Sequence, residues 1–194
     1  MPIEIRQAER DRLPALASVL GRAFVTEPMM CWPLGPGDDI EERLVSAFEY
    51  FLEDLIGLDM VWEADAGVGA SVWIPPGGAE AWAEAQLDQR VYALTDDGGQ
   101  RWDAFWTWVE SRHPEEHLWH LDSVAVEQTM QGRGIGSALI EFGLERARSA
   151  GDGVLLETGS ARNVTLYERL GFHVLEDVDA PQGGPHVWFM RWDP

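Results

Sequence analysis

The sequence predicts a mixed α/β fold, in which a central sheet of about seven strands is flanked by helices. Segments with strand-like alternation and segments with helical spacing follow one another along the chain, which is typical of α/β and α+β proteins. A glycine-rich turn at 131–136 separates a strand candidate at 118–126 from a helix candidate at 137–150. Two further strand candidates, at 172–178 and 186–192, close the chain as a pair.

The first half of the chain predicts three strands and two helices. Alternation of apolar and polar residues indicates strands, and an N-cap residue followed by apolar residues at helical spacing indicates a helix. The expected elements are a strand around Ile3 and Ile5, a helix from Asp11, a Pro- and Gly-rich loop over 28–37, a helix from Asp38 or Asp39, and a hairpin of strands at 58–63 and 68–74.

The second half begins with a helical segment that is dense in tryptophan. It covers 79–112, and the turn residues Asp97, Gly98 and Gly99 divide it into two helices. Later in the chain, Gly171 ends a short helix, as a glycine after the last helical turn commonly does. The remaining expected elements are strands at 117–126 and 154–158, the helix at 137–150, the short helix at 164–170, and the closing strands.

Length and charge limit the possible functions. The 194 residues fit one domain, 1–194, with a helical, Trp-rich insert at 79–113. The formal charge of −20 argues against nucleic acid or an anionic membrane as a partner and favours a cationic substrate. No apolar run approaches the ~20 residues of a membrane span, and the N-terminus lacks a signal-peptide pattern. Cys31 is the only cysteine, which agrees with a cytoplasmic protein.

The turn from Gln131 to Gly136 is the strongest functional signal. Backbone N–H groups at the start of a helix have no partner within the helix, and together with the helix dipole they attract phosphate. A dinucleotide-binding fold is the competing interpretation, and Glu157 stands about where its ribose-binding acid would be. The spacing argues against it, because that motif would need glycine at Ser137 or Leu139.

Two motifs give a family resemblance. Gln-x-x-Gly-x-Gly at 131–136, followed by Asn163 and by Tyr-Glu-x-Leu-Gly-Phe at 167–172, resembles the GCN5-related N-acetyltransferase (GNAT) superfamily. Stretches at 56–59, 72–73, 156–158, 161–163 and 167–172, with the tail from 177 to 190, resemble the puromycin N-acetyltransferases within it. The resemblance implies a mixed, twisted sheet in which the fourth and fifth strands splay apart and acetyl-CoA enters between them.

The resemblance also implies roles for individual residues. The turn binds the pyrophosphate of acetyl-CoA, the fourth strand pairs with the pantetheine arm, and a free N–H of that strand polarises the thioester carbonyl. Tyr167 is the expected general acid, and Asn163 either contacts the pantetheine arm or caps its helix. The implied cofactor-binding residues are Val124, Ala125, Val126, Gln131, Gly132, Arg133, Gly134, Ile135, Gly136, Ser137, Asn163 and Tyr167.

The general base stays open at this point. Period-two alternation places His120 and Asp122 on one face of the fourth strand, Glu157 is a third candidate, and a water molecule could serve instead. Glu27 either lines the acceptor pocket or is a surface carboxylate. Trp102 and Trp106, with Trp108, either wall the acceptor site or belong to the core. His113, His117, His173 and His186 show no metal-ligand spacing, so no metal site is expected.

These observations predict an acetyl-CoA-dependent N-acetyltransferase that acts on a primary amine of a small molecule, such as an aminonucleoside or another antibiotic-like compound, by direct transfer in a ternary complex. The alternatives are a protein or peptide N-acetyltransferase and a non-catalytic acyl-CoA-binding protein. The expected assembly is a monomer or a homodimer, with neither nucleic acid nor membrane as a partner.

Overall fold

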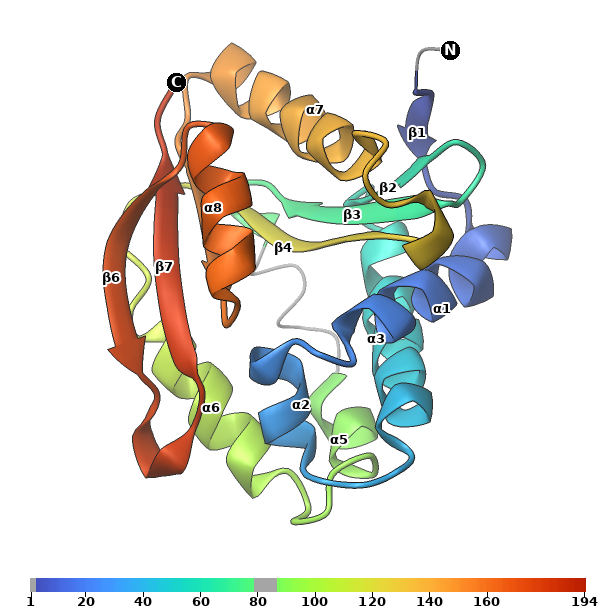
Figure 1. The fold of residues 1–194 in the computed structure, drawn as a ribbon, viewed down its shortest axis with the longest axis vertical. Helices are drawn as coiled ribbons and strands as arrows, with labels where there is room; N and C mark the ends of the chain where they lie inside the picture. Colours follow the sequence, from blue (N-terminus) through green and yellow to red (C-terminus); the bar gives the residue numbers. More distant parts are fainter. Residues whose placement is uncertain (1–2, 79–86) are drawn as a thin grey trace.

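The structure is a computed structural model that describes residues 3–78 and 87–194. Its sheet has seven strands in the order β1-β2-β3-β4-β5-β7-β6, and every neighbouring pair is antiparallel except β4 and β5 (Figure 1). The predicted mixed class is confirmed. The strands are β1 (Ile5–Gln7), β2 (Val61–Ala64), β3 (Gly69–Ile74), β4 (Trp119–Val126), β5 (Val154–Thr158), β6 (His173–Asp179) and β7 (His186–Trp192).

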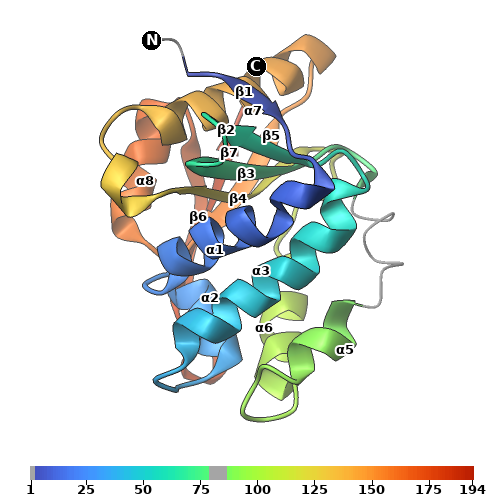
Figure 2. The ribbon, with the colours of Figure 1, turned by 90° about the vertical axis from the view of Figure 1, so that its right-hand side faces the viewer.

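Helices cover both faces of this sheet (Figure 2). On one face α7 packs against β3 and β4, and α8 packs against β5, through a cluster that includes Ile140 and Tyr167. On the opposite face α1 and α3 pack through a cluster that includes Leu20 and Phe48. The helices are α1 (Leu13–Phe24), α2 (Pro28–Leu34), α3 (Ile40–Ile56), α5 (Leu87–Tyr92), α6 (Gln100–Glu110), α7 (Ile135–Ala150) and α8 (Ala161–Arg169).

Strands β4 and β5 splay apart, as the resemblance predicts. They pair at only two positions, Trp119 with Val154 and His120 with Leu155, although β4 has eight residues and β5 has five. Beyond His120 the outer edge of β4 therefore faces an opening in the sheet. The opening connects the face covered by α7 and α8 with the face covered by α1 and α3.

A β-bulge interrupts β4 at this opening. The register against β3 shifts between the pairs Val72–Ser123 and Trp73–Leu121, so that Asp122 is the extra residue. As a result Leu121 belongs to the core cluster under α7, whereas Ala125, four residues later, belongs to the cluster under α1 and α3. The bulge lies between Leu121 and Ser123, so the strand does not alternate regularly from His120 to Asp122, although both residues face the opening.

Several predicted boundaries were wrong for local reasons. The segment expected as a loop after α1 forms α2, in which Pro28 takes the first helical position that proline tolerates and Gly35, with φ +86°, ends the helix. Asp11 lies in a 3₁₀ turn before α1 and is not its N-cap. Helices α7 and α8 begin two and three residues earlier than expected. Trp82 and the rest of 79–86 lie outside the described residues.

Candidate active site

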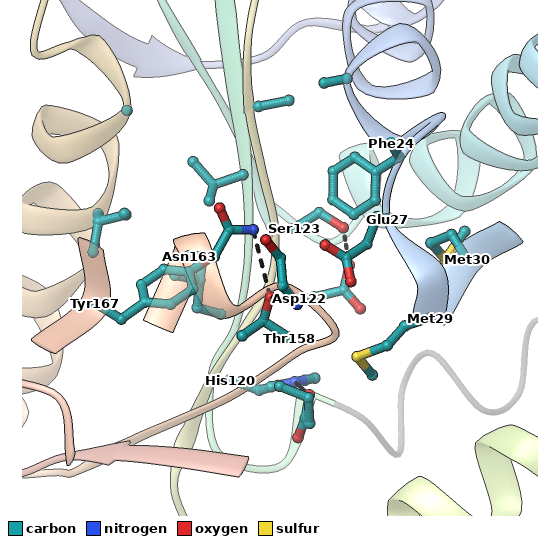
Figure 3. Close-up of a pocket in the computed structure, with 18 of the residues that line it drawn as sticks. Phe24, Glu27, Met29, Met30, His120, Asp122, Ser123, Thr158, Asn163 and Tyr167 are labelled. Atoms are coloured by element: carbon teal, nitrogen blue, oxygen red, sulfur yellow. Dashed lines mark hydrogen bonds and ion pairs between the residues drawn. The ribbon is translucent and has the colours of Figure 1, made fainter. Parts of the chain in front are cut away.

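A cavity of about 1590 Å³ fills the opening between β4 and β5. Its walls come from both faces of the sheet: the turn before α7 and the helix α8 on one side, and α1, α2 and α6 on the other. Figure 3 shows this arrangement, with Tyr167 and Asn163 opposite Glu27, Met29, Met30 and Phe24 and with Asp122 between them.

The glycine-rich turn has the backbone expected of an anion site. Gly132 and Gly134 adopt φ +75° and +81°, which side-chain-bearing residues rarely adopt, and a Cβ at either position would meet no atom within 4 Å. In the described part of the chain the N–H groups of residues 132–137 donate to no backbone carbonyl, and the first hydrogen bond runs from Ala138 N to Gly134 O at 2.9 Å. The turn is therefore open to a ligand and fits a phosphate group.

The end of β4 fixes this turn in place. Gln131 Nε2 donates to Val126 O at 3.2 Å, and Arg22 forms an ion pair with Glu127 at 2.6 Å. Ile135 is buried against the sheet, whereas Gln131, Gly132, Arg133 and Gly134 are exposed. The other cofactor-binding candidates, Val124, Ala125, Gly136 and Ser137, line the cavity together with Val126.

Three candidate catalytic groups meet at the start of the opening. His120 Nε2 lies 2.8 Å from Glu157 Oε2, and His113 Nε2 lies 2.5 Å from Glu157 Oε1. The two imidazole rings pack edge to face with centroids 5.4 Å apart. Glu157 is almost fully buried, with 6% of its side chain exposed. The side chains thus form one cluster, defined here as the Glu157 cluster: His113, His120 and Glu157.

Two members of the Glu157 cluster, Glu157 and His120, have strongly shifted pKa values. Burial alone would raise the pKa of Glu157, but the charge of His120 and the contacts with His113 and His120 together hold it far below its ordinary value of 4.5. Burial alone would lower the pKa of His120, but the charge and hydrogen bond of Glu157, with a smaller effect of Asp122, raise it to about 9. At neutral pH the cluster is therefore an ion pair between an imidazolium and a carboxylate.

The same three side chains have the composition of a metal-ligand set. Their nitrogen and oxygen atoms lie within 4.8 Å of one another, and two histidines with one carboxylate can bind a divalent transition-metal ion. In the structure these atoms are engaged with one another as ion pairs.

Asp122, the residue at the bulge, lies on the cavity next to this cluster. Its carboxylate accepts a hydrogen bond from Ser123 Oγ at 2.8 Å. Burial raises the pKa of Asp122, while His120 and Ser123 act in the opposite direction. Asp122 is therefore a weaker acid than an exposed aspartate.

Tyr167 and Asn163 project from α8 toward the cavity (Figure 3). Tyr167 is 7% exposed and packs edge to face against Phe172. Burial and the charges of Glu27 and Glu157 raise the pKa of Tyr167, so its hydroxyl stays protonated at neutral pH. Asn163 Nδ2 lies 3.4 Å from Thr158 Oγ1, and Ser160 is the N-cap of α8, so Asn163 does not cap this helix.

The acceptor candidates lie on the other side of the opening. Glu27 precedes α2, and its Oε1 accepts a hydrogen bond from Gly159 N at 2.8 Å. Burial raises the pKa of Glu27 above its ordinary value. Trp102 and Trp106 line the cavity, and Trp102 also stacks on Phe51 as part of the core. Trp108 packs against Phe189 of β7 and is a core residue.

His113 is the residue that sequence reasoning missed. It follows α6 in a loop, 44 positions before Glu157, and no spacing rule connects the two. The only signal in the sequence is the residue type: His113 is one of five histidines in the chain, and it lies at the end of the Trp-rich segment.

Comparisons with known proteins agree with this geometry. Residues 88–174 match the family model described as "Acetyltransferase (GNAT) domain". Curated relatives named L-methionine sulfoximine/L-methionine sulfone acetyltransferase occur in two Pseudomonas strains; that of Pseudomonas paraeruginosa is 27% identical over 150 residues, covering 72% of this chain and 84% of the relative.

Solved structures with the same fold include the histone acetyltransferase HPA2 and related acetyltransferase of Corynebacterium glutamicum. It superimposes with a TM-score of 0.76 at 26% identity, covering 100% of this chain and 97% of that one. A mutant agmatine N-acetyltransferase gives a TM-score of 0.67 at 19% identity over the full length of both chains, which bears on the fold alone.

None of the helices in the described ranges is long and apolar enough to cross a membrane. The match of residues 88–174 to the GNAT domain and the curated acetyltransferase relatives support an N-acetyltransferase enzyme.

Proposed function

We propose that the protein transfers the acetyl group of acetyl-CoA directly to the primary amine of a small molecule. One observation carries the proposal: a phosphate-binding turn on one face of the sheet and the Glu157 cluster on the other meet at a single opening between β4 and β5. An amine and a thioester can be held there side by side. Fixing two reactants in this way contributes roughly 7–11 kcal/mol to a rate acceleration.

The cofactor supplies an activated acetyl group when it is bound. The turn 131–136 fits its pyrophosphate, because the N–H groups of residues 132–136 donate to no backbone carbonyl in the described part of the chain and the glycines leave room for the anion. We propose that residues 124–126 of β4 contact the pantetheine arm through backbone groups on the edge that β5 leaves unpaired. An N–H on this edge can polarise a carbonyl oxygen.

Two side chains are proposed to move protons. His120 accepts the proton of the amine when its imidazole is neutral, a form that is the minor one at neutral pH and grows as the pH rises toward its pKa of about 9. Glu157 holds the imidazole in place and stabilises the imidazolium that forms, as a carboxylate does in other histidine-based sites. Tyr167 keeps its proton at neutral pH and donates it to the departing sulfur. Asp122 is the second candidate base, since its pKa is raised and it lies on the same cavity.

The acceptor is proposed to be a small molecule. The curated relatives are named for methionine sulfoximine and methionine sulfone, and the sequence resembles the puromycin N-acetyltransferases. Trp102 and Trp106 give the acceptor side an aromatic wall, and Glu27 offers a carboxylate to a cationic amine.

The direct test follows thiol release from acetyl-CoA with a thiol reagent across puromycin, polyamines, aminoglycosides, methionine sulfone and basic peptides. Release with a small-molecule amine supports the proposal, and release with peptides alone favours the peptide alternative. Acetyl-CoA binding in calorimetry without release for any amine would indicate a non-catalytic binding protein. Gly134→Glu places a carboxylate on the turn and should abolish acetyl-CoA binding; unchanged affinity would contradict the assignment of the turn.

A further inference from the structure

We propose that the Glu157 cluster is an inhibitory binding site for a zinc ion. The inhibition rests on the proposed function and adds a regulation to it, because the proposed base, His120, is one of the ligands. The proposal is carried by three side chains from separate segments, whose nitrogen and oxygen atoms converge at the wall of the cavity.

The donor atoms of the cluster lie close enough together to share one ion. One atom from each of the three residues lies within 4.8 Å of the others, and the nitrogens of His113 and His120 lie 2.5 and 2.8 Å from the oxygens of Glu157. Bonds of about 2.0–2.2 Å in a tetrahedral zinc site place neighbouring ligand atoms roughly 3.3–3.5 Å apart, so the cluster must open by roughly 0.5–1 Å to admit the ion. His113 can give way, because it lies in the loop between α6 and β4.

Two of these donor atoms are buried without a hydrogen bond. Glu157 Oε1 and His113 Nε2 touch, but neither atom has a hydrogen-bond partner of acceptable geometry among the described residues. The ring nitrogen of His113 is therefore not directed at this oxygen. Buried polar atoms without partners are costly, and a bound metal ion would satisfy both of these atoms at once.

The chemistry of the donor set favours zinc. Two imidazoles and one glutamate form a known zinc ligand set, in which three protein ligands leave a fourth position for water or another small ligand. Imidazole nitrogen suits transition-metal ions such as Zn²⁺, whereas Mg²⁺ and Ca²⁺ prefer oxygen ligands. All three residues of the cluster line the cavity, so a fourth position can open onto it.

Sequence spacing could not predict this site. His113 follows α6, His120 lies in β4, and Glu157 lies in β5, 37 positions after His120. The fold alone brings the three residues together. The lack of metal-ligand spacing among the histidines therefore does not argue against a metal site here.

Zinc at this position would block acetyl transfer. His120 Nε2, the atom that is proposed to accept the proton of the amine, would be bound to the ion, and Glu157 would be a ligand as well. The turn at 131–136 contributes no residue to the cluster. Zinc should therefore stop the transfer and leave the affinity for acetyl-CoA unchanged.

The binding test uses the full chain after treatment with a chelator and dialysis. Competition with a chromophoric chelator measures the affinity and the number of zinc ions, and Co²⁺ replaces zinc for visible spectroscopy. We expect one ion per chain and the strong visible absorption of four- or five-coordinate Co²⁺. His113→Asn should weaken zinc binding by about 100-fold or more, a larger loss than the usual effect of removing an outer partner of a ligand. Glu157→Gln, which keeps the size of the side chain, should give a loss of the same order.

Two control variants remove other metal-binding groups. His186→Asn removes an imidazole that pairs with Asp179 on β7, and Cys31→Ser removes the only thiol of the chain. Both variants should keep the native zinc affinity. Native affinity in both His113→Asn and Glu157→Gln would overturn the proposal, and so would several weakly bound, adventitious ions that no variant changes.

Inhibition is measured by chromatography of the acetylated amine, because the thiol of released CoA itself binds zinc. Stoichiometric zinc should stop the reaction of the native chain, and the chelator should restore it. One bound zinc ion per chain without inhibition would overturn the inhibitory role. If no amine is acetylated even with the chelator present, the proposed function fails, whereas single-site binding that depends on His113 and Glu157 still supports the zinc site.

Discussion

Two buried carboxylates in this protein are held in opposite ways. Glu63 in β2 is fully buried and receives Arg6 and Arg12, at 2.7 and 3.1 Å. Glu157 in β5 is almost as deeply buried and receives His113 and His120. The first site ties β1 and the turn before α1 to β2, whereas the second lies on the cavity at the point where β4 and β5 separate.

The difference lies in the partner. Arginine keeps its charge throughout the accessible pH range, so the Glu63 site is permanently paired. Histidine can release its proton. The raised pKa of His120 means that its stabilisation of the fold is fully present below about pH 6.5 and is lost as pH rises through about 9. A carboxylate that is held by histidine can therefore take part in proton transfer, and one that is held by arginine serves the fold.

The largest expected effect on activity comes from removing the charge of Glu157. Glu157→Gln keeps the size of the side chain but removes the group that orients His120 and stabilises its protonated form. Measured by thiol release above about pH 9, where His120 is neutral in both proteins, kcat/KM for acetyl transfer should fall about 100- to 1000-fold, with acetyl-CoA affinity in calorimetry unchanged. A loss below tenfold would exclude Glu157 from the reaction.

The matching change at the other carboxylate should act on stability instead. Glu63→Gln leaves Arg6 and Arg12 without their shared partner, and we expect the free energy of unfolding in urea to fall by about 2–3 kcal/mol. At a temperature where the variant is folded, kcat/KM should stay within about twofold of the native value. A large loss of activity in folded protein would contradict the division of roles between the two carboxylates.

Tyr167 tests the second proton transfer. Tyr167→Phe retains the packing against Phe172 and removes the hydroxyl, so kcat should fall about tenfold or more while the acetyl-CoA dissociation constant changes little. Slow thiol release in Tyr167→Phe, with cofactor binding as tight as in the native chain, would agree with Tyr167 as the proton donor to the sulfur. If kcat is unchanged, the residue only fills the space between α8 and the sheet.

The smallest effect is expected at His113. Its side chain is 29% exposed, and its Nε2 lies 2.5 Å from Glu157 Oε1. His113→Asn should lower kcat two- to fivefold, which corresponds to about 0.5–1 kcal/mol. His186→Asn removes a similar imidazole–carboxylate pair, with Asp179, at an exposed end of β7 and serves as the control with native kcat. If the two changes had equal effects on kcat, His113 would have no specific role in the reaction.

Much of this architecture was predictable because local rules determine it. The glycine turn, the strand at 154–158 and the closing strand at 186–192 follow from backbone preference and alternation. The helix α2 is not predictable from composition, because proline and glycine are typical of loops, whereas Pro28 and Gly35 here mark the start and the end of a short helix. The bulge at Asp122 and the meeting of His113 with Glu157 depend on tertiary register and packing, which no local pattern encodes.

The central claim is that Glu157 sets the protonation of His120 and thereby the rate of transfer. It is tested most directly by the pH dependence of kcat/KM in the native chain and in Glu157→Gln, with an acceptor amine that stays neutral across the range. Because only neutral His120 accepts a proton, native kcat/KM should rise with pH through a midpoint near 9. The midpoint in Glu157→Gln should move to about pH 6.5 or below, because burial, which lowers the pKa of His120, then outweighs the smaller opposite effect of Asp122. Identical midpoints in the two proteins would contradict the account.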